Sequence, residues 1–239
     1  MDDRSPFTPL NAPTQQRPLL GMTILVVEDS RFACDALRLL CLRSGARIRR
    51  ADCLASARRH LQIYRPTVAI IDLGLPDGSG TDLIAELSHA NPRVEVVLGM
   101  SGDDMADALA IAAGADGFLA KPIQSLAMFQ ETILSHLPSE KCPAGPRIVT
   151  EERITPDPVA YRDDLLHAAD TLQDADGEET TIDYVAQFLG GLARSAEDRP
   201  LLDVIDAIRN ARKAGRMPVG DVARLNGLVR ERLARAATF

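Results

Sequence analysis

The feature that most restricts the fold of this chain is an alternation between short apolar runs and longer amphipathic segments. Residues 68–71 are apolar throughout and have the length and composition of a strand buried on both faces. We expect four further strands at residues 23–27, 46–50, 94–98 and 117–120. Helical spacing of apolar residues follows each run, at 31–44, 54–64, 81–90, 103–113 and 125–137. The alternation predicts an α/β fold, with a doubly wound five-stranded parallel sheet of (βα)5 order and right-handed crossovers.

Polar residues stand at the ends of four of these runs. Glu28 and Asp29 follow the first strand, Asp72 follows the third, Ser101 follows the fourth and Lys121 follows the fifth. Because ligands of an open parallel sheet bind beyond the carboxyl ends of its strands, we expect all five side chains to face one crevice. A single strand-end acid is weak evidence, since it could merely cap the next helix. The coincidence of the five is far more specific.

This combination suits the transfer of a phosphoryl group to a carboxylate. Asp72 would act as the nucleophile, and Mg2+ held by Asp29 and Asp72 would neutralise oxygens of the transferring group. Lys121 would supply a positive charge, and Ser101 would donate a hydroxyl hydrogen bond. The alternative for the acidic pair at residues 28–29 is a solvated loop without a metal.

With these residues the chain resembles the receiver domain of two-component response regulators. The resemblance rests on the acidic pair, on Ile71-Asp72-x-x-Leu75-Pro76-x-x-x-Gly80, on Ser101-Gly102 and on Lys121-Pro122. It covers about residues 22–137.

The resemblance implies a role for each matching position. Asp72 would be the phosphoacceptor, Asp29 the direct metal ligand and Glu28 a ligand that acts through water. The backbone carbonyl of Gly74 would complete the protein's share of the metal coordination. Lys121 and Ser101 would serve catalysis.

Two further expectations come from the same resemblance. Phe118 matches the aromatic switch position that responds to movement of Ser101; the alternative is an ordinary core residue. The peptide bond between Lys121 and Pro122 is expected to be cis.

The rest of the chain divides by composition. Residues 1–21 are rich in proline and are expected to form a flexible leader that buries little, and residues 22–137 form the receiver domain. Residues 138–158 have the composition of a proline-rich linker. Residues 159–236 have the pattern of amphipathic helices, at 159–172, 181–195, from about 200, and 219–236, which suits a small all-α bundle or a dimer interface.

The last helices are unusually basic. Residues 209–235 hold eight lysines or arginines and two acidic residues, which could form a phosphate-contacting face for DNA. A solvated face that pairs with the acidic segment 163–179 is the plainer interpretation. His167 invites comparison with phosphotransfer histidines, but Asp170 stands where such domains have a basic residue, so we expect a surface or core histidine.

Composition excludes some classes of protein. A formal net charge of -7 argues against a globally basic nucleic-acid binder. No apolar run approaches the roughly 18 residues of a membrane helix, and the first residues do not have the pattern of a signal peptide. The four cysteines form no Cys-x-x-Cys pair, and Cys34 and Cys41 are expected to be small buried thiols. We therefore expect a cytoplasmic protein without a membrane contact.

Together these features predict a response regulator that a histidine kinase or phosphotransfer protein phosphorylates on Asp72, with Mg2+ as cofactor. We expect no enzyme activity beyond its own phosphoryl transfer and dephosphorylation. Phosphorylation would repack the surface of residues 103–137 and control association through residues 159–236, with this surface, a second copy or a downstream protein as partner. The alternatives are a DNA-binding transcriptional regulator that uses the basic helices, and a phosphorelay adaptor.

Overall fold

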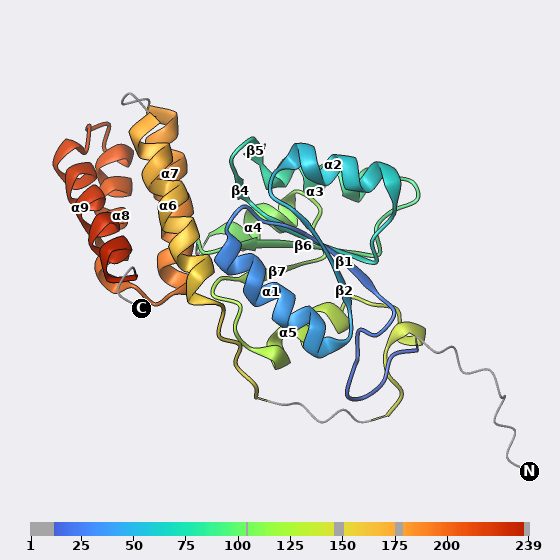
Figure 1. Cartoon of the computed structure of the whole chain (residues 1–239). Helices are drawn as coiled ribbons and strands as arrows, with labels where there is room; N and C mark the ends of the chain where they lie inside the picture. Colours follow the sequence, from blue (N-terminus) through green and yellow to red (C-terminus); the bar gives the residue numbers. More distant parts are fainter. Residues whose placement is uncertain (1–11, 104, 146–150, 175–178, 237–239) are drawn as a thin grey trace, which may run out of the picture.

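The computed structural model describes residues 12–103, 105–145, 151–174 and 179–236, and shows a sheet domain followed by a bundle of helices (Figure 1). The central sheet contains β1 (Thr23–Val27), β2 (Arg47–Ala51), β3 (Val68–Asp72), β6 (Val96–Ser101) and β7 (Gly117–Ala120), in the spatial order β2-β1-β3-β6-β7. Every neighbouring pair in this sheet is parallel. The predicted α/β fold with five parallel strands is confirmed.

Helices cover both faces of the sheet. α1 (Arg31–Ser44) and α5 (Leu126–Leu134) pack on one face, and α2 (Leu54–Ile63), α3 (Gly80–His89) and α4 (Ala106–Ala112) pack on the other. Strand β1 shows why its residues are all apolar: Ile24 and Val26 belong to the first core, whereas Leu25 and Val27 belong to the second. Successive side chains of a strand point to opposite faces, so a central strand needs apolar residues at every position.

The fourth large strand ends later than its sequence suggests. β6 continues through Gly99 to Ser101, where the sequence predicted a loop after residue 98. A Cβ atom on Gly99 would lie 2.4 Å from the Cβ of Ala110, so the glycine allows α4 to pack directly on the strand. A short antiparallel hairpin of β4 (Gly74–Leu75) and β5 (Gly78–Ser79), which was not predicted, leads from β3 into α3.

The segments expected to be a leader and a linker contribute to the core where they are described. Residues 1–11 and 146–150 lie outside the described residues. Leu19 is fully buried among the residues of α1, β1 and α5, and its backbone N–H donates to the carbonyl of Ser44 at 2.9 Å. Ile154 is buried in the same cluster, and its N–H donates to the carbonyl of Gln124 at 2.8 Å. The expectation that residues 12–21 bury little is wrong, because one apolar side chain anchors the proline-rich stretch.

The C-terminal region is helical, as predicted. It contains α6 (Pro158–Asp174), α7 (Glu179–Ser195), α8 (Arg199–Lys213) and α9 (Val219–Ala236), and these pack around Leu165, Val185, Leu189, Ile205 and Val229. Asp198 caps α8 by accepting from the N–H of Leu201 at 3.2 Å. Among the described residues, no helix has the length and hydropathy needed to cross a membrane.

The bundle docks on α1 and on the short strand β4, beside the carboxyl edge of the sheet (Figure 1). Phe32 of α1 is buried in the core of the bundle and meets the ring of Tyr161 edge to face, with 5.6 Å between centroids. The sequence offered the surface of residues 103–137 or another chain as the partner of these helices. The apolar stripes of α6 to α9 pack mainly against one another, and the main contact of the bundle with the sheet domain is that of α6 and α7 with α1, not with the surface of residues 103–137. Association with another chain stays a prediction.

Candidate functional site

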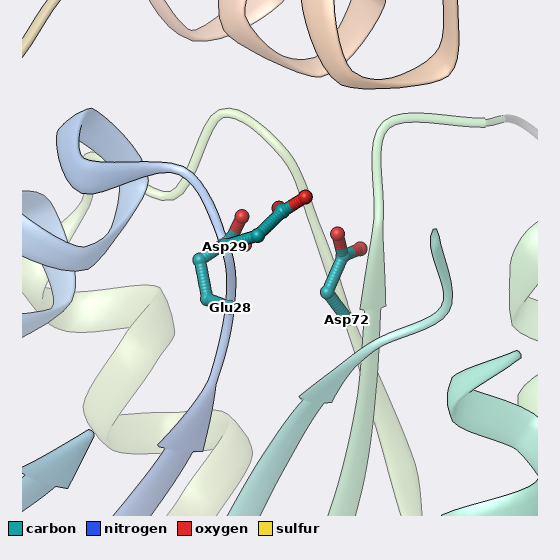
Figure 2. Close-up of side chains that lie close together, drawn as sticks. All are labelled: Glu28, Asp29 and Asp72. Carbon is teal, nitrogen blue, oxygen red and sulfur yellow. The ribbon is translucent and has the colours of Figure 1, made fainter. Parts of the chain in front are cut away.

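Three carboxylates converge beyond the ends of β1 and β3. Glu28 and Asp29 directly follow β1, and Asp72 is the last residue of β3 (Figure 2). One ligand oxygen from each lies within 4.8 Å of the others. Glu28 and Asp72 are buried, and Asp29 is half-buried. The structure therefore brings together the three acids that the sequence selected.

Lys121 completes the floor of the site. Its ammonium lies 2.6 Å from Oε2 of Glu28 and 3.1 Å from Oδ2 of Asp72, with 7% of the side chain exposed. Among the residues the structure describes, this is the one cation in ion-pair contact with these acids. One positive charge facing three carboxylates leaves an excess of negative charge.

The pKa values of all three acids are raised. Burial raises the pKa of Asp72 to about 7 and that of Glu28 to about 7, in spite of the attraction of Lys121. Burial and the charge of Asp72 raise the pKa of Asp29 to about 6. All-oxygen ligands with surplus negative charge are the donor set that a hard divalent cation prefers, so these residues fit a metal site.

The remaining predicted residues surround this floor. Ser101 ends β6, is buried, and accepts from the N–H of Asp103 at 3.2 Å. Phe118 is half-buried beside Gly99 in the neighbouring strand. Gly74 lines the cavity above Asp72, and the Lys121–Pro122 peptide bond is cis. The functional roles assigned to these residues stay predictions.

Other residues reach the site from the C-terminal bundle, and sequence reasoning missed them. The hydroxyl of Tyr184 in α7 donates to Oδ2 of Asp29 at 2.8 Å. The amide of Gln187 lies directly over Gly74, where a Cβ atom would come within 1.8 Å of its Nε2. The second position after Asp72 therefore carries no side chain because α7 occupies that space. No local pattern signals these contacts, which span more than a hundred residues of sequence.

Asp164 of α6 binds the first turn of α1. Its Oδ2 accepts from the hydroxyl of Ser30 at 2.7 Å and from the N–H of Phe32 at 3.0 Å, and its Oδ1 accepts from the N–H of Arg31 at 2.9 Å. Ser30 in turn accepts from the N–H of Ala33 at 3.0 Å. The free N–H groups at the start of a helix favour a negative charge, so the bundle supplies a cap for the helix that follows the acidic pair.

The basic residues of the last helices are partly neutralised within the bundle. Arg212 pairs with Asp183 through two nitrogens, at 2.9 and 3.0 Å, and Arg232 pairs in the same way with Asp198, at 2.9 and 3.0 Å. These partners lie outside the acidic segment 163–179, so the expected pairing with that segment is not confirmed. His167 is exposed and packs edge to face against Phe188, as expected of a surface histidine.

The cysteines are all free thiols. Cys34 and Cys41 are buried in α1, as predicted, and burial raises the pKa of both thiols to about 12. Cys53 caps α2 by accepting from the N–H of Ser56 at 3.4 Å.

Comparison with known protein families finds a match for the sheet domain. Residues 24–132 match the model of the response regulator receiver domain. This range contains the three carboxylates, Ser101, Phe118 and Lys121, and it leaves out the bundle.

Transcriptional regulators match about two fifths of the chain. The KDP operon transcriptional regulatory protein KdpE of Escherichia coli is 32% identical over 99 residues, which cover 41% of this chain and 44% of that protein. The virulence transcriptional regulatory protein PhoP of Salmonella typhimurium is 30% identical over 102 residues, covering 42% of this chain and 46% of the relative. The match thus spans less than half the length of these relatives.

Solved structures with a similar fold also cover about half of the chain. A putative response regulator from Chloroflexus aurantiacus has a TM-score of 0.43 and 26% identity, over 48% of this chain and 93% of its own. A CheY-like receiver domain protein from Methanospirillum hungatei has a TM-score of 0.45 and 21% identity, over 50% of this chain and 95% of its own.

Proposed function

Residues 24–132 of this chain form a response regulator receiver domain, and we propose that the protein is a cytoplasmic two-component regulator phosphorylated on Asp72. The observation that carries the proposal is the group of Glu28, Asp29 and Asp72 against Lys121, at the carboxyl ends of β1, β3 and β7 of one parallel sheet. A histidine kinase or a phosphotransfer protein would supply the phosphoryl group. The chain would catalyse only its own phosphorylation and dephosphorylation.

The chemistry follows from the positions of the side chains. A carboxylate oxygen of Asp72 attacks phosphorus, the bond from phosphorus to the leaving group breaks, and an acyl phosphate forms. Lys121 is already held against Asp72 and stabilises the added negative charge. Ser101, at the end of the adjacent strand β6, is placed to donate its hydroxyl to a phosphoryl oxygen.

We propose Mg2+ as the cofactor, held by Asp29 and Asp72 with Glu28 as a ligand through water and the carbonyl of Gly74. The bound cation would offset the charge of the transferring group. The chain's own contribution is to hold the three acids together, although burial and the neighbouring carboxylates raise the pKa values of all three.

Labelling with acetyl phosphate tests the phosphoacceptor. Asp72 should be the single labelled residue in the presence of Mg2+, and Asp72→Asn, which keeps the shape and loses the nucleophile, should abolish the label without unfolding the chain. Asp82→Asn makes the same charge change at an exposed position of α3 and should be labelled normally. Phosphate that persists in the Asp72 variant would refute the assignment.

We propose that the output is protein association controlled by the bundle, as a homodimer or with a downstream partner. The docking of α6 and α7 beside the site supports this, because a change at Asp72 occurs next to the helices that would respond.

DNA binding is the alternative, and one observation favours it. Arg216, Arg224 and Arg230 are exposed and make no ion pair with any described residue. DNA affinity that falls steeply with salt and disappears with Arg224→Glu and Arg230→Glu would select this output. An adaptor role in a phosphorelay would instead require phosphoryl transfer onward from Asp72.

A further inference from the structure

The cavity above Asp72 has walls from two parts of the chain. It has a volume of about 780 Å³. Its receiver side contains Asp29, Asp72, Ser101 and Lys121, and its opposite side consists of residues from α7 and α8. The polar side chains on the bundle side include those of Gln187, Arg194, Asp206 and Arg209.

Glycines bring α7 close to the loops that surround Asp72. A Cβ atom on Gly102 would lie 3.2 Å from Cδ and 3.4 Å from Nη1 of Arg194, and 3.8 Å from Cβ of Lys121. A Cβ atom on Gly191 would lie 3.9 Å from Nζ of Lys121. The side chain of Arg194 therefore runs beside the Ser101–Gly102 turn and beside Lys121, two of the groups that face a phosphoryl group on Asp72.

A second arginine reaches the same place. A Cβ atom on Gly190 would lie 3.1 Å from Nη2 of Arg209 and 3.5 Å from Nη1 of Arg194. Neither arginine has an ion pair or a hydrogen bond with any residue that the structure describes, whereas Arg212 and Arg232 of the same bundle are each paired through two nitrogens.

Two half-buried cations that lie side by side without an ion-pair partner repel each other. Burial and the neighbouring Arg194 lower the pKa of Arg209, and the carboxylates of Asp103 and Asp206 compensate only in part. A bound anion between the two guanidinium groups would remove this repulsion. Lys121 supplies one positive charge beside Asp72, but it shares that charge with Glu28, so the two arginines would add to its effect on a bound anion.

We propose that Arg194 and Arg209 bind the phosphoryl group on Asp72, so that the C-terminal bundle completes the phosphorylation site. The inference rests on the proposed function. A phosphoryl group carries close to two negative charges and three acceptor oxygens, and guanidinium groups match these oxygens with paired N–H donors. The bundle thereby senses phosphorylation by direct contact, and phosphorylation strengthens the docking of α7 and α8 on the receiver.

Binding of beryllofluoride in the presence of Mg2+ tests the proposal, since beryllofluoride stands in for the phosphoryl group. Arg194→Gln, Arg209→Gln and the double variant of the full chain are titrated by calorimetry. Each single substitution should weaken binding about tenfold, the effect of losing one charge-assisted hydrogen bond. Arg199→Gln removes the same charge from an exposed position of α8 outside the cavity and should bind like the wild type. Arg194→Lys keeps the charge without the forked donors and should bind between the wild type and Arg194→Gln.

Two readouts separate this inference from the proposed function. Beryllofluoride should increase amide protection in α7 and α8 of the wild type and not in the double variant, whose fold is checked by circular dichroism. If acetyl phosphate labels Asp72 but the double variant binds beryllofluoride as tightly as the wild type, the inference is overturned and the proposed function stands. If the wild type takes no label at Asp72, the proposed function itself fails, and the proposed role of the arginines fails with it. Should the double variant not fold, the order of affinity among wild type, Arg194→Lys and Arg194→Gln decides the same question.

Discussion

The cap that Asp164 places on α1 should decide whether the bundle stays docked. The carboxylate accepts three hydrogen bonds, from the hydroxyl of Ser30 and from the N–H groups of Arg31 and Phe32, and it is 2% exposed. Asp164→Asn replaces one acceptor oxygen by an NH2 donor. In either orientation of the amide, at least one backbone N–H of α1 then faces a donor.

The loss can be estimated from these contacts. A buried N–H left without an acceptor costs about 1–3 kcal/mol. Loss of the negative charge at a helix N-terminus costs about 0.3–1 kcal/mol more. We therefore expect Asp164→Asn to lower the free energy of undocking by about 1–4 kcal/mol.

Asp163→Asn provides the matched control. Asp163 is the preceding residue of α6 and pairs with the side chain of Arg31 at 2.7 Å, but the two side chains are 36% and 67% exposed. An exposed ion pair contributes about 0–1 kcal/mol, so this variant should change little. Both variants remove one negative charge near the same helix.

Hydrogen exchange gives the required local readout. The amides of the first turn of α1 and those of α6 should exchange faster in Asp164→Asn, while the amides of the central strand β3 should be unaffected. Equal effects of the two substitutions would show that only overall charge matters. An unchanged exchange rate in Asp164→Asn would refute the account of docking through the cap.

Three further predictions concern the site. In the presence of a chelator, the free energy of unfolding should fall as pH rises from about 4 to about 7. The reason is that the folded state binds protons more tightly at Glu28, Asp29 and Asp72 than the unfolded chain does. Urea unfolding measures this free energy, and a rise over the same pH interval would contradict the pKa shifts. Mg2+ at a hundredfold excess over its Kd should add about 2.7 kcal/mol to the stability of the wild type and nothing to Asp29→Ala. If Mg2+ raises the melting temperature of Asp29→Ala as much as that of the wild type, the metal site is excluded. Gly74→Ala should weaken docking of α7 by about 1–2 kcal/mol, because its Cβ atom clashes with Gln187. Adding Gln187→Ala should restore the protection of the α7 amides against hydrogen exchange. If it does not, the clash with Gln187 is not the cause.

Much of the receiver could be predicted from the sequence, for a physical reason. Central strands of a parallel sheet are apolar at every position, so their limits are visible as runs, and β1, α1 and β7 begin and end at the expected residues. The carboxyl ends of such strands meet at one edge of the sheet, which is why Glu28, Asp72 and Lys121 could be assigned to one site from the sequence. Where a glycine serves packing instead of a turn, as Gly99 does against α4, the same reasoning ended the strand too early.

The placement of the bundle was decided by the tertiary structure alone. The amphipathic pattern of α6 to α9 shows that these helices bury one face, but an apolar stripe does not specify which surface covers it. That choice depends on contacts between residues far apart in the chain: Phe32 enters the bundle core, Asp164 caps α1, and Tyr184 binds Asp29. Only the docked structure brings these residues into contact across the two surfaces, because shape and charge complementarity between surfaces leaves no local periodic signal in the sequence.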